Sequence, residues 1–124
     1  MRFNKEAHLW DEKPRRVELG KNVANYIKKY CDNKTILDFG CGTGLVSLNL
    51  CNAKEILGCD LSSEMVKIYS QKAKILKCNA KAVCEDVVNI DKKFDVIVAS
   101  MVFHHIKDIQ GMLKILHSKL TNNG

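Results

Sequence analysis

Short apolar runs alternate with longer amphipathic stretches along the chain. Four runs have the length and composition of buried strands, at residues 36–39, 56–59, 80–84 and 94–99. Between and around them, apolar residues recur every three or four positions, which predicts helices. The predicted helices cover residues 1–13, 14–31, 44–53, a stretch that begins at Ser62, and 107–120.

This alternation of strands and helices predicts an α/β fold, because parallel strands need a crossover between them. The fourth run is apolar at five of its six positions, as expected of a parallel strand that is buried on both faces. We predict a doubly wound parallel sheet with strand order 3-2-1-4 in a three-layer α/β/α arrangement, preceded by N-terminal helices.

The helical spacing also predicts which side chains face the core. These are Val17, Val23, Ile27 and Tyr30 in the second helix, Met65, Ile68 and Tyr69 in the helix after Ser62, and Ile109, Leu113, Leu116 and Leu120 in the last helix. Ser62 is a suitable N-cap, and Glu64 in the first turn suits the helix dipole.

A turn with glycine at every second position follows the first strand. Asp38 stands near the end of that strand, and Gly40, Gly42 and Gly44 follow it. Glycines let a ligand lie against bare backbone and let the chain adopt dihedrals that other residues resist. Leu45 stands where a phosphate loop needs lysine and where a dinucleotide fingerprint needs its third glycine. An ordinary tight turn is the alternative reading.

A second acid follows the next strand, since Asp60 stands twenty positions after Gly40. A carboxylate at this point can accept two hydrogen bonds from a ribose diol. Asp38 beside bare backbone suits a cationic amine better than a pyrophosphate. A ligand with an amine and a ribose but no phosphate describes S-adenosylmethionine.

The motifs Asp38-x-Gly40-x-Gly42-x-Gly44 and Asp60-Leu61-Ser62 closely resemble the first two motifs of the class I, Rossmann-like S-adenosylmethionine-dependent methyltransferases. The resemblance implies a methyl transfer that releases S-adenosyl-L-homocysteine. It also implies a first group of cofactor-binding residues: Asp38, Gly40, Cys41, Gly42, Gly44, Asp60, Leu61 and Met65.

Further site residues are expected after the third and fourth strands. In the family, an acid after the third strand binds the adenine amino group and the next backbone amide meets the ring. Asp86 and Val87 match this pattern, with Glu85 as the alternative acid. Ser100 and Met101 follow the fourth strand, at the edge where an open α/β sheet binds its ligands.

His104 and His105 come next and are the candidate catalytic residues. Histidine titrates near neutral pH and can act as a general base where the acceptor is poorly ionised. The alternative role for both is helix capping or packing beneath the cofactor.

The chain ends are interpreted through the same resemblance. The string Trp10-Asp11-x-x-Pro14-x-Arg16 is similar to the entry of many small methyltransferases, which implies a helical lid over the cofactor; a core tryptophan is the alternative. We expect one domain over residues 1–124, with the lid and first helix in 1–31 and the βα units in 32–124. Family members add three more strands, so this chain is expected to be a cofactor-binding half, whose bare fourth-strand edge can form a homodimer.

Composition narrows the function classes. The net charge is +6, but the lysines are scattered, and the cluster of Lys72, Lys74 and Lys77 has no interleaved aromatic residues, which favours solvated faces over nucleic-acid binding. No apolar run approaches the about 20 residues that span a bilayer, and no secretion signal is apparent. The six cysteines lack metal-ligand spacing. We therefore expect reduced, mostly buried thiols, no metal site and a cytoplasmic location.

The sequence thus predicts a methyltransferase acting on a small molecule. Nucleic acid is disfavoured as the acceptor, because Ser100-Met101-Val102-Phe103 stands where base-flipping relatives carry an Asn-Pro-Pro-Tyr type motif. Two alternatives stay open. One is a cofactor-binding module without catalysis, and the other is a nicotinamide-dependent oxidoreductase, which Leu45 disfavours.

Overall fold

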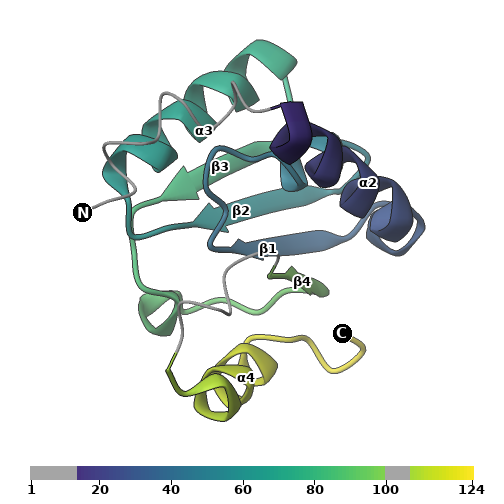
Figure 1. Ribbon diagram of the computed structural model, residues 1–124. Helices are drawn as coiled ribbons and strands as arrows, with labels where there is room; N and C mark the ends of the chain where they lie inside the picture. The colour runs from purple at the N-terminus through teal and green to yellow at the C-terminus, as the bar shows by residue number, and fades with distance from the viewer. Residues whose placement is uncertain (1–13, 100–106) are drawn as a thin grey trace.

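The computed structural model describes residues 14–99 and 107–124. Its centre is a four-stranded parallel sheet with strand order β3-β2-β1-β4, as the sequence predicts (Figure 1). The strands are β1 (Thr35–Phe39), β2 (Glu55–Cys59), β3 (Ala80–Val83) and β4 (Val96–Val98). The helices are α2 (Pro14–Cys31), α3 (Ser63–Leu76) and α4 (Ile109–Ser118), with two short 3-10 helices, η1 (Ser47–Asn49) and η2 (Val87–Asn89).

Helices cover both faces of the sheet, which confirms the three-layer prediction (Figure 1). On one face, Ile36 of β1 and Ile56 of β2 form a buried cluster with Ala24 and Cys31 of α2. Tyr69 and Ala73 bring α3 onto the same face, beside β3. The opposite face is covered by η2 and α4, which contribute the next cluster. Its buried members are Leu37, Leu57, Cys59, Val87, Ile90, Phe94 and Leu116.

The N-cap predicted at Ser62 is confirmed, because its hydroxyl accepts a hydrogen bond from the backbone N–H of Met65 at 3.3 Å. The helix predicted over residues 44–53 is wrong in type, since only η1 forms there. The reason is local competition. The Asn49 side chain donates to the carbonyl of Leu45, and the backbone amides of Asn49 and Leu50 bond three residues back rather than four.

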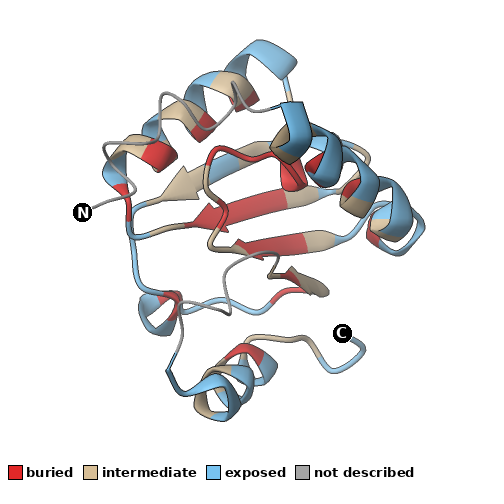
Figure 2. Ribbon diagram, in the orientation of Figure 1, coloured by how far each residue is buried: buried red, intermediate tan, exposed pale blue. Residues whose placement is uncertain are grey.

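Three predicted core positions face solvent. Tyr30 is 60% exposed, Ile109 46% and Leu113 51%. The buried residues of α2 are the small Gly20, Ala24 and Cys31, and Tyr30 does not belong to its buried face. Figure 2 shows that the buried positions of α2 lie on the side toward the sheet. A β-carbon on Gly20 would overlap the carbonyl of Leu45, so the helix lies directly against the segment after the glycine turn. In α4 only Leu116 is fully buried.

The prediction that all cysteines are reduced is also wrong. Cys51, after η1, forms a disulfide with Cys78, after α3, and their Cα atoms lie 5.3 Å apart. The two residues are 27 positions apart in sequence, so spacing alone gave no sign of the pairing. Cys31, Cys41 and Cys59 are buried free thiols, as expected, while the free thiol of Cys84 is exposed.

Within the described residues, no helix is long and apolar enough to cross a membrane.

Candidate functional site

The three glycines of the turn all adopt a left-handed backbone. Their φ angles are +68° at Gly40, +54° at Gly42 and +87° at Gly44, a region that other residues enter only with strain. The turn is fixed to the end of β2, because the N–H groups of Gly40 and Cys41 both donate to the carbonyl of Cys59, at 2.9 and 3.0 Å. The sequence prediction of a special backbone here is thus confirmed.

Gly42 and Gly44 have opposite surroundings. A β-carbon on Gly44 would lie 2.6 Å from Leu48 Cδ1 and 2.9 Å from Tyr69 Cδ2, so this glycine packs against the core. A β-carbon on Gly42 would meet nothing within 4 Å. The turn therefore packs tightly at Gly44 and leaves open space at Gly42, where a ligand can approach the backbone.

Asp60 lies against the turn. Its Oδ2 accepts the N–H of Gly42 at 2.9 Å, and its Oδ1 accepts the N–H of Ser62 at 2.9 Å. A carboxylate offers about four acceptor positions, so two stay available for a ligand. The structure thus joins the two sequence motifs through one hydrogen bond, because the acid after β2 is held by the middle glycine after β1.

Asp38 lies beneath the turn, with 3% of its surface exposed. Burial raises the pKa of its carboxyl from 3.8 to about 7, with a hydrogen bond from Ser47 acting against the shift and the charge of Asp60 adding to it. Burial also raises the pKa of the Cys41 and Cys59 thiols, so both stay neutral. The site therefore places the Asp38 and Asp60 carboxyls close enough for the charge of one to act on the other, with no counter-cation among the described groups that act on Asp38.

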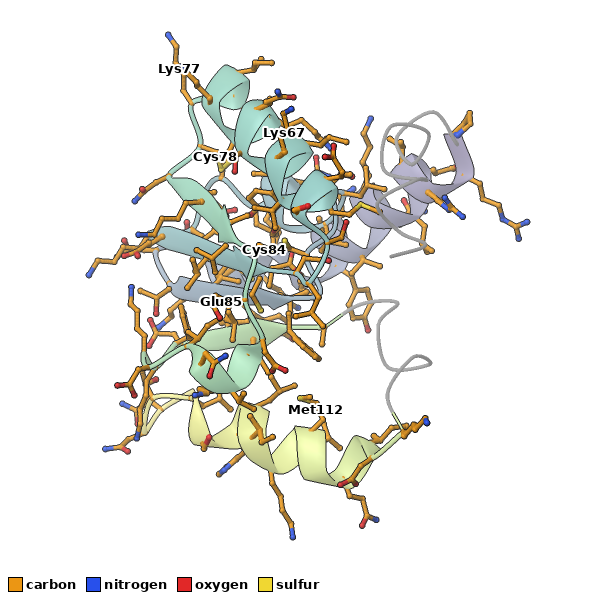
Figure 3. The ribbon with its side chains drawn as sticks, turned by 90° about the vertical axis from the view of Figure 1, so that its left-hand side faces the viewer. Lys67, Lys77, Cys78, Cys84, Glu85 and Met112 are labelled. Carbon is orange, nitrogen blue, oxygen red and sulfur yellow. A yellow bond between two sulfur atoms is a disulfide. The ribbon has the colours of Figure 1, made fainter. Side chains whose placement is uncertain are left out.

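The other predicted residues surround the carboxyl ends of β2 and β3. Leu61 is 59% exposed. Met65 lies on the face of α3 that meets the sheet and is 3% exposed. Asp86 is exposed and caps η2 by accepting the N–H of Val88 at 3.1 Å, and the Val87 side chain is in the core. Figure 3 views this end of the sheet, with Cys84 and Glu85 in the segment that leaves β3.

Several predictions concern residues outside the described part of the chain. These are the lid with Trp10, the site residues Ser100 and Met101, and the candidate bases His104 and His105. Within the described ranges, no three His, Cys, Asp or Glu side chains gather as a metal site.

Sequence reasoning missed a polar contact below the turn. Ser47 and Tyr69 are both fully buried, and their hydroxyl oxygens are 2.8 Å apart. The burial of Tyr69 was predicted from helical spacing, but its partner was not. A usable signal was present, because a buried tyrosine hydroxyl generally needs a hydrogen-bond partner.

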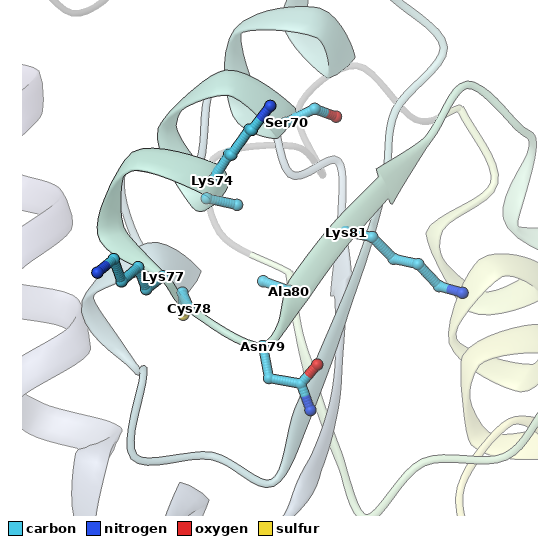
Figure 4. Close-up of a pocket in the computed structure, with 8 residues that line it drawn as sticks. Ser70, Lys74, Lys77, Cys78, Asn79, Ala80 and Lys81 are labelled. Carbon is cyan, nitrogen blue, oxygen red and sulfur yellow. The ribbon is translucent and has the colours of Figure 1, made fainter.

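A hollow elsewhere on the surface does not belong to this site. It lies at the opposite end of β3, and its lining includes Ser70, Lys74, Lys77, Asn79 and Lys81. Figure 4 shows the Lys77 and Lys81 side chains pointing away from each other. Their ammonium groups do not converge on one point, so the hollow has no arranged anion site.

Residues 37–124 match a protein family whose description is "Methyltransferase domain". The chain belongs to this family. The match runs from β1 through α4, and so contains the glycine turn and both acids.

Two curated relatives of this methyltransferase domain illustrate its range. An uncharacterised methyltransferase of Schizosaccharomyces pombe is 37% identical over 115 residues, covering 83% of this chain and 40% of the relative. A ubiquinone biosynthesis O-methyltransferase of Pelagibacter ubique is 34% identical over 96 residues, covering 74% of this chain and 40% of the relative. The domain therefore spans about two fifths of the length of these relatives.

Solved structures show the same fold. An S-adenosylmethionine-dependent methyltransferase of Clostridium acetobutylicum superposes with a TM-score of 0.76 at 26% identity, covering 100% of this chain and 55% of that one. Magnesium protoporphyrin IX methyltransferase of Synechocystis, solved with bound S-adenosylmethionine, gives a TM-score of 0.73 at 20% identity over 86% of this chain and 57% of that one.

Proposed function

We propose that the chain binds S-adenosylmethionine and belongs to an enzyme that transfers its methyl group to a small-molecule acceptor. The observation that carries this proposal is the hydrogen bond from Gly42 to Asp60, an acid close enough to the buried Asp38 for its charge to act on that carboxyl. It supports one site in which an acid for an amine and an acid for a diol flank bare backbone. Relatives and structural neighbours named as methyltransferases support the same reading.

The residues present fit such a cofactor. Gly42 leaves open space at the turn, where a β-carbon would otherwise project toward the ligand. Asp60 has two acceptor positions left for a ribose diol, and the carboxylate of Asp38 supplies the charge that a cationic amine requires. Asp86 at the next strand end is exposed and offers its second oxygen to an exocyclic amine.

The bound cofactor would supply an electrophilic methyl group on a sulfonium. The chain's own part is then binding and alignment, because displacement from a sulfonium needs no acid for the leaving group. Asp60 would hold the ribose, and the glycine turn would let the ligand approach the backbone. Asp86 and the backbone amide of Val87 would orient the adenine ring. His104 or His105 is proposed to accept a proton where the acceptor is poorly ionised.

Binding is tested by calorimetry with S-adenosylhomocysteine, S-adenosylmethionine and NADH. We expect heat with the first two and none with NADH. Asp60→Asn should weaken binding roughly tenfold or more, since a charge-assisted hydrogen bond contributes about 1.5–3 kcal/mol. Asp91→Asn is the matched control, because Asp91 is exposed, and it should bind as the parent does. Binding of NADH instead, or no binding by folded protein, would overturn the proposal.

Turnover is tested separately, because the domain spans about two fifths of the curated relatives. Transfer of a labelled methyl group to a panel of small hydroxy, amino and carboxy compounds supports the enzyme. Cofactor binding without transfer to any of them favours the non-catalytic binding module.

A further inference from the structure

Tyr69 lies directly under the glycine turn. It is a fully buried residue of α3, and its ring approaches two glycines from below. A β-carbon on Gly44 would lie 2.9 Å from ring atom Cδ2, and one on Gly58 of β2 would lie 3.3 Å from Cε2. Glycine at these two positions therefore makes room for the tyrosine ring.

The Tyr69 hydroxyl connects to Asp38 through one side chain. It lies 2.8 Å from Ser47 Oγ, and Ser47, through both its hydroxyl and its backbone N–H, acts to lower the pKa of the Asp38 carboxyl. Each hydroxyl carries a single proton. When Ser47 donates its proton to the carboxylate, its oxygen is left to accept from Tyr69. Burial raises the pKa of Tyr69 further above its ordinary value, so Tyr69 keeps the proton that it donates.

We propose that Tyr69 is a positioning residue of the cofactor site, which holds the Ser47 hydroxyl as a donor to the ionised carboxylate of Asp38. We call this series of hydrogen bonds, from Tyr69 to Ser47 to Asp38, the relay, and it runs from α3 through η1 to β1. A series of hydrogen bonds in a buried setting polarises each member, so the donor farther out strengthens the bond nearer the charge. The role in binding rests on the proposed function, in which Asp38 carries the charge that attracts the cofactor's amine.

The other groups that the structure describes around Asp38 do not stabilise its charge. Burial and the charge of Asp60 both disfavour ionisation of Asp38, whereas Ser47 favours it. Cys41 and Cys59 are neutral neighbours, since burial raises the pKa of both thiols. Val98, the residue paired with Asp38 on β4, is apolar. Among the described groups that act on this carboxyl, Ser47 is thus the one that stabilises its charge.

The first test follows the carboxyl itself. The ¹³C chemical shift of the Asp38 carboxyl is titrated by NMR in the parent, in Tyr69→Phe and in Tyr26→Phe, with Asp38→Asn used to assign the signal. Tyr26 is 82% exposed and provides the same chemical change away from the site. We expect the Asp38 midpoint to rise by roughly 0.5–1 pH unit in Tyr69→Phe, as loss of one hydrogen bond of ordinary strength implies.

Tyr26→Phe should leave that midpoint unchanged. Ser47→Ala breaks the same series of hydrogen bonds and leaves the Tyr69 ring in place. It should raise the Asp38 midpoint further than Tyr69→Phe does, and it serves as the test if Tyr69→Phe does not fold. An unchanged midpoint in folded Tyr69→Phe, or in Ser47→Ala, overturns the relay.

The second test measures binding of S-adenosylhomocysteine across pH. If the ligand's amine pairs with ionised Asp38, affinity falls below the midpoint of the free carboxyl. The pH at which affinity begins to fall should then move up in Tyr69→Phe by the same amount as the NMR midpoint. Equal binding profiles despite a shifted midpoint overturn the positioning role. No binding by the folded parent at any pH overturns the proposed function and that role together, while the NMR titration still decides the relay.

Discussion

At the scale of single residues, the buried setting of Asp38 disfavours its charged form. A carboxyl with a pKa raised from 3.8 to about 7 binds more protons when folded than when unfolded between these values. Its contribution to stability is therefore fully present below about pH 4 and is lost as the pH rises toward about 7.

This gives a prediction for Asp38→Asn. The free energy of unfolding of the parent, from urea titrations, should fall relative to the variant as the pH rises from about 4 to about 7. The difference should approach about 4 kcal/mol across that window, since each pKa unit corresponds to about 1.4 kcal/mol. Asp91→Asn is the control and should follow the parent. Parallel stability curves for the parent and Asp38→Asn would contradict the raised pKa.

The glycines of the turn have separable roles, which two alanine variants can distinguish. Gly44→Ala should lower the free energy of unfolding by about 3 kcal/mol, because a left-handed backbone and overlap with Leu48 and Tyr69 combine. Gly42→Ala meets no neighbour, so it should lower that free energy by only about 1–2 kcal/mol. Its main effect should be weaker binding of S-adenosylhomocysteine.

Denaturant titration and calorimetry on the same preparations check both effects. Equal loss of stability in the two variants would contradict the difference in packing. Unchanged ligand affinity in Gly42→Ala would contradict the assignment of its open side to the ligand.

At the scale of elements, strands and strongly periodic helices were predictable and their contacts were not. The bounds of α2 and the order of the strands follow from apolar runs and spacing. The exposure of Tyr30 could not be predicted in this way. Helix α2 packs on the sheet through the small residues Gly20 and Ala24, whereas the spacing of large apolar residues was used to predict its buried face. The short η1 was missed because side-chain competition from Asn49 depends on local geometry.

The disulfide between Cys51 and Cys78 gives the prediction for this scale. It joins the end of η1 to the end of α3 across 27 positions. Closing a loop of this size should stabilise the fold by about 3–4 kcal/mol through the unfolded state. Cys51→Ala should therefore have a lower midpoint of unfolding than the parent without reductant, and the two should converge when reductant is added.

Cys84→Ala provides the control, because Cys84 is an exposed free thiol and should unfold as the parent does under both conditions. A parent protein whose stability does not respond to reductant would contradict a structural role for this bond. Mass spectrometry of alkylated protein shows independently whether the two thiols are paired.

At the scale of the whole molecule, the site could be predicted as far as its motifs reach. Gly42 and Asp60 were expected in one site from their spacing, and the structure brings them into a hydrogen bond. The support beneath them was not foreseen, because Ser47 and Tyr69 meet only once η1 and α3 pack on the same face of the sheet. Such tertiary contacts leave no periodic signal in the sequence.

The sheet order also places β4 at one edge of the described sheet, next to β1. Among the described residues, the C-terminal segment pairs with the chain just before β4, where the backbone of Phe94 donates to Lys119 and accepts from Thr121. The carbonyl of Thr35 accepts the N–H of Asp95, so the odd-numbered residues of β1 face β4. With Leu37 paired to Ile97, the backbone groups of Val96 and Val98 point toward β1, and the described amide of β4 that faces away from β1 is that of Ile97. Unpaired edge amides beside apolar side chains favour pairing with a second copy.

We therefore predict that the isolated chain dimerises reversibly through β4. Sedimentation velocity over a wide dilution series should show a monomer and a dimer in exchange. Ile97→Pro removes an outward amide and should shift this equilibrium toward monomer, whereas Ile97→Ala keeps the amide and should dimerise more strongly than Ile97→Pro. A parent protein that is monomeric at every concentration would contradict dimerisation through β4. A dimer that is equally strong in both folded variants would locate the contact elsewhere on the molecule.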